Sequence, residues 1–454
     1  MRCSKARNVT GALKDRRVVD SERSRKICNE SNKKLDCDDD KVVKFRCDFP
    51  STQLKVMLAR GWKQVVDPDD SSWRLWWCET SDVRAALDRK LDPSQKIPHF
   101  RNHYELTRKN FLCRNLKRYK KLLSKSGKLL EAQLCDSMPI TFELPSEYRM
   151  LVEEYHKQQG ATWIVKPANR SQGNGIFLFR KLKDLADWKS KESNKAKESG
   201  DKEAPPETFI VQKYVDNPYL LAGKKFDLRI YVLVTSFYPL KVWLAREGFA
   251  RLSAELFDLS NIGNCKVHLT NMAIQLRARE KNAEKQDFKW ALSKVREYLT
   301  KKHGEAAMED LFQRIAGVIM ASLLAVQPVI IQEKNSFELY GYDVLLDECL
   351  KPWLLEVNAS PALTGTDSED YRLKFDLLDD VLNILDLEAR LSGRESRVGG
   401  FDLLWEDGPV FYTDSTSTEQ GSPTKKLNIF LGAGNNRTNH LRLLHQVLEK
   451  QFRK

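Results

Sequence analysis

One segment of the sequence, residues 337–361, constrains the fold more than any other part of the chain. It reads FELYGYDVLLDECLKPWLLEVNASP, and its pattern of apolar and polar residues predicts a strand, a turn and a second strand. Residues two apart in a strand share a face, so Glu356 and Asn358 would point in the same direction. The opposite face of the second strand would be apolar, with Trp353, Leu355 and Val357.

Asp343 lies in the first of these two strands, among mostly apolar neighbours. The hairpin would bring its carboxylate close to Glu356 and Asn358. Two carboxylates and an amide offer the hard oxygen ligands that Mg²⁺ prefers, and a buried carboxylate is costly unless an opposite charge compensates it. The segment therefore predicts a magnesium site, although a pair of strands with polar edges is the simpler alternative.

Composition narrows the classes of protein to consider. The 454 residues are enough for two or three domains, and 41% of them are hydrophobic, so most of the chain can fold. A net charge of +13 favours an acidic partner, which could be nucleic acid, an anionic membrane or an acidic protein surface. The nine cysteines include no Cys-x-x-Cys pair, which argues against a zinc ribbon or a redox motif. No apolar run approaches the roughly 18–20 residues of a membrane span, and the N-terminus lacks the apolar stretch of a secretory signal.

Predicted strands and helices alternate along the chain, so we expect an α+β (mixed α/β) fold with more than one layered domain. A stretch at 101–128 carries ten Lys or Arg against one acid. It is either a solvated basic face or a docking surface for an acidic polymer. The expected regions are a disordered polar tail (1–41), an N-terminal domain (42–136), a central domain with a mobile insert at 189–207 (137–224), a C-terminal domain (225–410) and a flexible tail (411–454).

A glycine-containing loop, KPANRSQGNG at residues 166–175, lies between two predicted strands. Gly173 and Gly175 would let the backbone turn tightly and approach a phosphate, although a plain hairpin is the commoner explanation for such a pair. The loop is not a Walker motif, because no Gly-Lys-Ser/Thr follows, and it lacks the helix that follows a Rossmann fingerprint. Lys166 ends the preceding strand, from which its side chain would reach a nucleotide phosphate.

A second group of charges lies on the predicted strand KKFDLRIYVLV. Lys225, Asp227 and Arg229 alternate on one face, and the residues between them are apolar. A structural ladder of ion pairs is one explanation. A site that grips phosphate and a carboxylate substrate is the other, because arginine offers a bidentate fork. Arg246 ends the next predicted strand and would join the same cleft.

The motif HLTN adds three more polar residues. His268 suits a structural hydrogen bond better than a role as a base, and Thr270 and Asn271 suit either a site or a turn. The chain contains neither a His-Arg-Asp loop nor an Asp-Phe-Gly motif, which argues against a protein kinase. It also contains no Gly-x-Ser-x-Gly nucleophile elbow.

Taken together, these motifs resemble the ATP-grasp fold and, within it, the tubulin tyrosine ligase-like family. The resemblance covers about residues 45–410, follows the order of the family's motifs, and is greatest to polyglutamylases associated with cilia and flagella. It implies N-terminal, central and C-terminal domains of an ATP-grasp enzyme. The matching segments are HFRNHYELTRKN (99–110), WIVKP with SQGNGIFLF (163–179), QKYVDNPYLL (212–221), KKFDLRIYVLV (224–234), HLTN (268–271), ELYGYDVLLD (338–347), WLLEVNASP (353–361) and GRESRVGGFDLLW (393–405).

The resemblance also implies a role for each matching residue. Lys166 and Lys225 would contact the phosphates of ATP, and Asp343, Glu356 and Asn358 would hold Mg²⁺. The other implied roles are ATP contacts for Gln172, Gly173, Gly175 and Asp227, adenine contacts for Gln212, Lys213 and Tyr214, catalytic or acceptor-region roles for Asp227, Arg229 and Arg246, and substrate contacts for Arg229, Arg246, Thr270 and Asn271.

The implied reaction has two steps. A glutamate carboxylate on a tubulin tail attacks the γ-phosphate of ATP and gives an acyl phosphate. The amino group of free glutamate then displaces phosphate and forms an isopeptide bond. The acidic tail would match the basic stretch at 101–128. The implied location is the cytoplasm and cytoskeleton, at the axoneme or basal body of a cilium or flagellum, with accessory subunits as further partners and neither membrane nor nucleic acid expected.

One residue departs from the family pattern. Asn174 stands between the two glycines where a basic residue is usual, which puts in doubt how the loop grips phosphate. Two alternatives to glutamate ligation stay open at this point. One is a glycine ligase on the same scaffold, and the other is a non-catalytic protein that binds microtubules through its basic surface.

Overall fold

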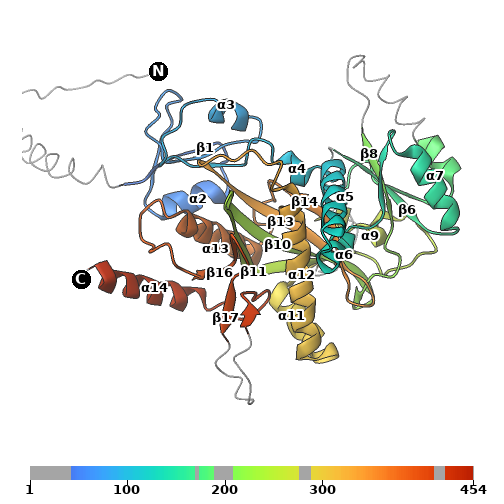
Figure 1. The fold of residues 1–454 in the computed structure, drawn as a ribbon. Helices are drawn as coiled ribbons and strands as arrows, with labels where there is room; N and C mark the ends of the chain where they lie inside the picture. The colour runs from blue at the N-terminus through green and yellow to red at the C-terminus, as the bar shows by residue number, and fades with distance from the viewer. Residues whose placement is uncertain are drawn as a thin grey trace, which may run out of the picture.

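The computed structural model describes residues 42–168, 173–188, 208–272, 274–275, 288–413 and 425–452. Within this part of the chain the strands form four sheets, to which helices contribute further layers, so the mixed α/β class is confirmed. The largest sheet, called the central sheet below, has the order β14-β13-β10-β11-β16-β15, with β12 beside β11, β4 beside β13 and β9 beside β10 (Figure 1). Its strands are β4 (Ile97–Pro98), β9 (Leu220–Leu221), β10 (Lys224–Phe237), β11 (Leu240–Leu252), β12 (Lys289–Ala291), β13 (Ser336–Leu346), β14 (Pro352–Asn358), β15 (Arg397–Val398) and β16 (Phe401–Glu406).

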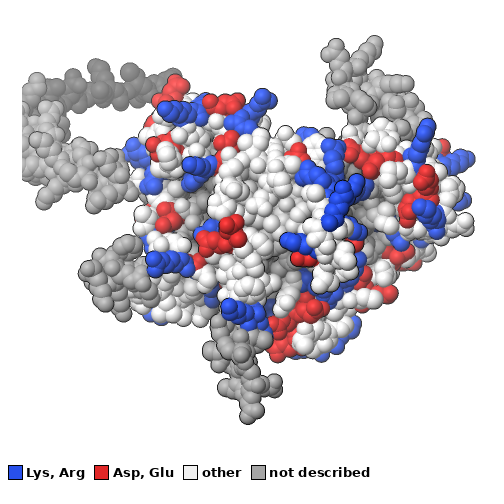
Figure 2. All heavy atoms as spheres, viewed as in Figure 1, with Lys and Arg blue, Asp and Glu red and all other residues white. Residues whose placement is uncertain are grey.

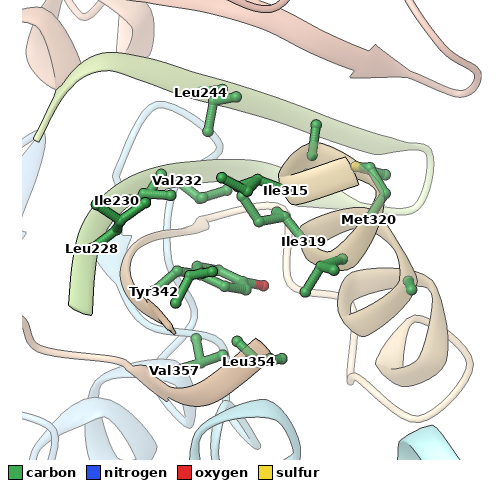
Figure 3. Packing of buried hydrophobic residues seen from close by; sticks show 14 of the residues in the cluster. Leu228, Ile230, Val232, Leu244, Ile315, Ile319, Met320, Tyr342, Leu354 and Val357 are labelled. Carbon is green, nitrogen blue, oxygen red and sulfur yellow. The ribbon is translucent and has the colours of Figure 1, made fainter. Parts of the chain in front are cut away.

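Helices cover one face of the central sheet, and the longest of them, α12, packs directly on the strands (Figure 1). Leu228, Ile230 and Val232 alternate along β10 and pack among Ile315 and Ile319 of α12 (Figure 3). Full burial of each such side chain contributes about 1.5–3 kcal/mol. The helices of this layer are α4 (Tyr104–Thr107), α5 (Lys109–Lys125), α6 (Leu129–Leu134), α11 (Leu292–His303) and α12 (Glu305–Val326).

This packing decides where the charges of β10 point. Because residues two apart share a face of a strand, the residues between Leu228, Ile230 and Val232 must face away from α12. Both flanking strands, β11 and β13, run antiparallel to β10 and hold it in the middle of the sheet. The charged face of β10 is therefore buried as well, and its ionisable side chains need partners.

A second apolar cluster lies on the other face of the central sheet. It joins helix α13 to α2 and to the first small sheet, where Trp77 packs edge-on against Phe337 of β13. The elements of this layer are β1 (Lys44–Cys47), α2 (Thr52–Ala59), β2 (Lys63–Gln64), β3 (Leu75–Trp77) and α13 (Ser368–Leu385). Helix α3 (Val83–Leu87) packs in a separate small cluster with Trp73 and Trp76.

A four-stranded sheet of order β5-β8-β6-β7 lies at one end of the molecule with helix α7 against it (Figure 1). The two strands predicted around the glycine loop are present as β6 and β7, which pair antiparallel. The elements here are β5 (Thr141–Leu144), α7 (Tyr148–Lys157), β6 (Trp163–Pro167), β7 (Phe177–Phe179), β8 (Phe209–Lys213) and the short helix α9 (Cys265–His268). The 3₁₀ turn η2 (Cys135–Ser137) precedes β5 in the sequence and packs with α5, α6 and α12.

The region after residue 410 was expected to be a flexible tail, but its described part contains regular structure. Strands β17 (Phe411–Thr413) and β18 (Lys425–Leu427) pair, and helix α14 (Arg437–Phe452) follows. Arg437 ties α14 to three carboxylates of α13, namely Asp376, Asp379 and Asp380. These residues therefore do not form the structureless tail that composition suggested.

Two other predicted features, the polar tail at 1–41 and the insert at 189–207, lie outside the described residues. The predicted domain boundaries stay a proposal, and the pairing of β4 with β13 ties the N-terminal region into the central sheet. Among the helices of the described residues, none is both long and apolar enough to cross a membrane.

Candidate active site

The predicted hairpin of carboxylates is present as strands β13 and β14. Asp343 lies directly opposite Glu356 in the antiparallel pairing, and Asn358 lies opposite Gly341. The Asn358 amide nitrogen is 3.4 Å from Asp343 Oδ2 and donates to the Gly341 carbonyl at 3.2 Å. The three side chains predicted to converge therefore do so.

One detail of the hairpin was predicted wrongly. The register shifts between Asp343 and Val344, whose partners are Glu356 and Leu354, so that Leu355 is the extra residue of a β-bulge. Leu354 and Val357 are in the core, whereas Leu355 lines the same pocket as Glu356. Simple alternation had placed Leu355 on the opposite face. The bulge gives the acidic edge of the site an apolar neighbour.

A pocket of about 80 Å³ lies between the central sheet and the four-stranded sheet. Ligand pockets typically measure about 300–1,000 Å³, so a nucleotide would require its walls to move apart. Ten of the sequence-predicted site residues line it: Lys166, Gln212, Lys213, Tyr214, Lys225, Asp227, Thr270, Asn271, Asp343 and Glu356. Side chains far apart in the sequence thus line one pocket.

Two buried lysines face this pocket and bind neutral partners. Lys166 donates to the Gln212 side-chain oxygen at 2.7 Å. Lys225 donates to the Tyr214 hydroxyl and to the His268 carbonyl, both at 2.9 Å. Burial lowers the pKa of Lys166 to about 8 and that of Lys225 to about 7. An anion in the pocket would favour their charged forms and supply the missing counter-charge.

The carboxylates of the pocket are bound by arginines in a continuous network. Arg229 holds Asp343 with two nitrogens, at 2.6 and 3.1 Å. Arg251 bridges Asp227 at 2.5 Å and Asp343 at 2.7 Å. Ion pairs are therefore present, but they join Asp227 and Arg229 to Arg251 and Asp343 of the neighbouring strands, and Lys225 takes no part in them. Burial raises the pKa of Asp343, against the opposing effect of Arg229 and Arg251.

Glu356 has a different cation. Lys109, the first residue of α5, places its ammonium 3.1 Å from Glu356 Oε2. Burial would raise the pKa of Glu356, but Lys109, a hydrogen bond with Asp343 and the charge of Arg251 together hold that pKa below its usual range. Lys109 belongs to the basic stretch 101–128, which we had interpreted only as a surface.

Arg246 does not join this site. It forms a two-nitrogen ion pair with Asp402 of β16, at 2.6 and 2.7 Å, and stacks on Phe430. Arg246 is absent from the described residues that line the pocket. Arg251 takes the place expected for it, because β11 continues past Arg246 and only its later residues lie opposite Asp227. The expected end of the strand at Arg246 caused this error.

Sequence reasoning missed Arg251 as a member of the site, and it missed two lysines of a neighbouring cluster that do not line the pocket. Arg251 could have been found by continuing the strand pattern of β11. Lys289 lies opposite Arg251 in the pairing of β11 with β12 and binds Asp370 at 3.0 Å. Lys374 of α13 binds the same carboxylate at 2.9 Å and is almost fully buried. No local pattern marked Lys289 or Lys374, because their common partner Asp370 comes from a distant segment.

Within the glycine loop, residues 169–172, which include Gln172, lie outside the described residues. Gly173 and Gly175 have φ of +79° and +73°, the left-handed conformation that favours glycine. A Cβ on Gly173 would come within 2.7 Å of Ile274 Cδ1 and 3.2 Å of Asn271 Oδ1. The loop therefore packs closely against the residues that follow His268. Asn174 between the glycines is exposed.

The structural role expected for His268 agrees with its contacts. Its two ring nitrogens lie 3.1 Å from the Tyr214 hydroxyl and 3.0 Å from the Asn261 carbonyl. Burial lowers its pKa, which favours the neutral ring. Thr270 donates to Asp227 at 2.8 Å and so belongs to the acidic network.

The donor set fits a hard divalent cation. Asp343 and Glu356 present carboxylates from opposed positions, and Asn358, whose amide nitrogen faces Asp343 in this structure, would add its amide oxygen, with water and a phosphate as the usual remaining ligands of Mg²⁺. The described residues contain no cluster of three or more His, Cys, Asp or Glu side chains that could hold a metal ion. An ion here would therefore depend on the amide as well as on the two carboxylates.

Comparison with known proteins agrees with this geometry. Residues 87–393 match the model of the tubulin-tyrosine ligase family. The chain is 46% identical over 435 residues to the probable tubulin polyglutamylase TTLL9 of Mus musculus, covering 90% of this chain and 94% of the mouse protein. It is 44% identical over 367 residues to the probable tubulin polyglutamylase ttll-9 of Caenorhabditis elegans, covering 80% and 85% of the two chains. It is 42% identical over 394 residues to the probable alpha-tubulin polyglutamylase Ttll1 of Tetrahymena thermophila, covering 81% and 94%. The chain therefore belongs to the tubulin-tyrosine ligase family.

Proposed function

We propose that this protein is an ATP-dependent ligase that adds glutamate to glutamate side chains of tubulin tails. The observation that carries the proposal is the meeting of two buried lysines with Asp343 and Glu356 in one pocket, with Asn358 next to Asp343 on the paired strand. Relatives that align with this chain over most of their length are named for this activity. In this reaction a tail carboxylate is phosphorylated by ATP, and the amine of free glutamate then displaces phosphate.

Lys166 and Lys225 are the proposed contacts for the phosphates of ATP. Both ammonium groups are buried and bound to neutral groups, so a phosphate would relieve the cost of their burial. Gln212, Lys213 and Tyr214 line the same pocket from the end of β8 and are the proposed contacts for the base. Gly173 and Gly175, with Gln172 before them, would form the loop that covers the phosphates.

Asp343, Glu356 and Asn358 are the residues that would hold Mg²⁺. The ion, when bound, supplies positive charge to the phosphoryl group in transfer. The chain's own part is to fix the backbone positions of the three donors on paired strands.

Basic residues beside this centre suit a substrate with two carboxylates. Arg251 is in the wall of the pocket, and Lys289 and Lys374 converge on Asp370 next to it. Arg229 and Asp227 would orient the reacting groups through the same network, and Thr270 and Asn271 would contact substrate. The roles first proposed for Arg246 pass to Arg251. Glutamate, with a second carboxylate, matches this charge better than glycine does.

The basic stretch on α5 supports an acidic protein partner, but fewer of its charges are available than the composition suggested. Arg114 and Lys117 pair with Glu143 and Glu147. Lysines remain exposed near the end of α5, and Figure 2 shows basic residues gathered over this helix. We propose that this surface approaches the acidic tubulin tail on the cytoskeleton of a cilium or flagellum, with accessory subunits as further partners.

The test is incorporation of radiolabelled glutamate, and separately of glycine, onto microtubules with ATP and Mg²⁺. Glutamate should be incorporated by the natural protein and lost in Glu356→Gln, whose folding is checked by circular dichroism. Incorporation of glycine alone would contradict the assignment of glutamate as the substrate. Full activity of Glu356→Gln would contradict the metal assignment. If neither amino acid is incorporated, absence of ATP binding by the purified chain would favour the scaffold alternative.

A further inference from the structure

Lys109 stands in an unusual position for a lysine. It is the first residue of the 17-residue helix α5, whose first turn contains no acidic residue. A cation at this end faces the positive end of the helix dipole, which is unfavourable. Only 9% of Lys109 is exposed, and lysine is rarely buried unless it is paired. Two independent costs therefore fall on one side chain.

The contact that offsets these costs is with a proposed metal ligand. Lys109 Nζ lies 3.1 Å from Glu356 Oε2, and the Glu356 side chain keeps 23% of its surface exposed. Other basic residues near the pocket bind different partners: Arg229 and Arg251 bind Asp343, and Lys166 binds Gln212. Lys109 is thus the cation that neutralises Glu356 when no ligand is present.

We propose that Lys109 is an internal counter-cation that takes the place of the metal charge at Glu356 and must release this carboxylate when a divalent cation binds. The proposal rests on the metal assignment made above and adds a step to it. Lys109 acts through Glu356, so it is a positioning residue. Its ammonium stabilises the ligand-free site and competes with the ion.

The competition has a thermodynamic consequence. A group that stabilises only the metal-free state lowers metal affinity by the same factor by which it stabilises that state. Removing the ammonium should therefore make the metal-free protein less stable and make it bind metal more tightly. A residue that served only to pack α5 would lower stability without raising metal affinity.

The test compares Lys109→Met with Lys117→Met on the full chain. Lys117 is on the same helix and also lies 3.1 Å from a carboxylate, that of Glu147, but on the surface. Without metal, Lys109→Met should lower the melting temperature by several degrees, and Lys117→Met should barely change it. Equal melting temperatures for the two variants would overturn the proposal.

Metal affinity is measured with Mn²⁺ alone, by titration calorimetry. Lys109→Met should bind Mn²⁺ at least about tenfold more tightly than the natural protein, the factor for about 1.4 kcal/mol. Lys166→Met controls for loss of a nearby positive charge that binds no carboxylate, and its affinity should rise less. Unchanged or weaker binding in Lys109→Met would overturn the proposal while leaving the metal site standing. Absence of Mn²⁺ binding in the natural protein would overturn both.

A double variant keeps the proposal testable if Lys109→Met folds poorly. Lys109→Met combined with Glu356→Gln removes both charges, so no carboxylate is left without its cation. The double variant should melt at or above the temperature of Lys109→Met alone. A further drop, as from two independent packing losses, would contradict a pairwise role.

Discussion

The two walls of the pocket differ in how their charges are balanced. The acidic wall consists of Asp227, Asp343 and Glu356, and each of these carboxylates is paired with a cation. The lysine wall consists of Lys166 and Lys225, whose described hydrogen bonds go only to neutral groups. The acidic wall is therefore stable without a ligand. The lysine wall carries an unrelieved cost of burial, visible in its lowered pKa values. One half of the site is held in shape by the protein, and the other half gains its counter-charge from the ligand.

The largest effect should follow from breaking the acidic wall. Asp343→Asn removes the carboxylate that binds both Arg229 and Arg251, and should lower the free energy of unfolding by about 3–5 kcal/mol, measured by urea denaturation. Asp402→Asn is the matched control, because it breaks the equally buried pair with Arg246 outside the pocket. Both variants should lose stability, but only Asp343→Asn should lose Mn²⁺ binding. A stable Asp343→Asn would show that the ion pairs do not hold this wall.

The lysine wall should respond in the opposite sense. Lys225→Met should weaken ATP binding by roughly 10–100-fold, the factor expected for one charge-assisted contact. The ligand-free protein should not be destabilised, because a costly buried ammonium is removed. Calorimetry measures the affinity and thermal melting the stability. Lys224→Met, a change to the neighbouring residue outside the pocket lining, should retain ATP affinity. Equal losses of ATP affinity in Lys225→Met and Lys224→Met would contradict the proposed role of the lysine wall.

The same wall predicts a pH dependence. The pKa of Lys225 is about 7 in the folded protein, against about 10.5 in an unfolded chain, so the unfolded state binds more protons between these values. The stability of the ligand-free protein should therefore rise with pH from 7 towards 10. ATP favours the charged lysine, so its affinity should fall over pH 7 to 9, with proton uptake on binding. Lys225→Met should flatten this profile, and a flat profile in the natural protein would contradict the assignment.

The smallest effect concerns the loop above the lysine wall. Gly173→Ala puts a side chain at φ +79° and 2.7 Å from Ile274, and should cost about 1 kcal/mol and weaken ATP binding a few-fold. Gly160 has a similar φ of +81°, but no atom lies within 4 Å of an added Cβ. Gly160→Ala therefore measures the cost of backbone strain alone. The difference between the two variants in thermal melting measures the packing of the loop. No difference would mean that the loop moves freely over Asn271.

The local patterns of the sequence predicted correctly which side chains of β10 share a face and that the hairpin of β13 and β14 forms. Alternation placed Lys225, Asp227 and Arg229 on one face of β10, and the hairpin placed Asp343 beside Glu356. These predictions depend only on the two-residue period of a strand.

What could not be predicted depends on contacts between distant segments. The bulge at Leu355 changes the period within β14, and nothing in the composition of the strand marks it. Arg246 and Arg251 are both arginines on β11, and only the pairing of β11 with β10 and β16 decides which one meets Asp227. The basic stretch hid Lys109 for the same reason, since its partner is 247 positions away in the sequence.

The short strand β4 has a consequence for how this protein can be divided. Ile97 and Pro98 pair in parallel with Ser336 and Phe337 at the beginning of β13. A fragment that started after α6 would uncover this edge of the central sheet, and it would also remove the cation of Glu356. Truncation would thus damage the sheet and the site together.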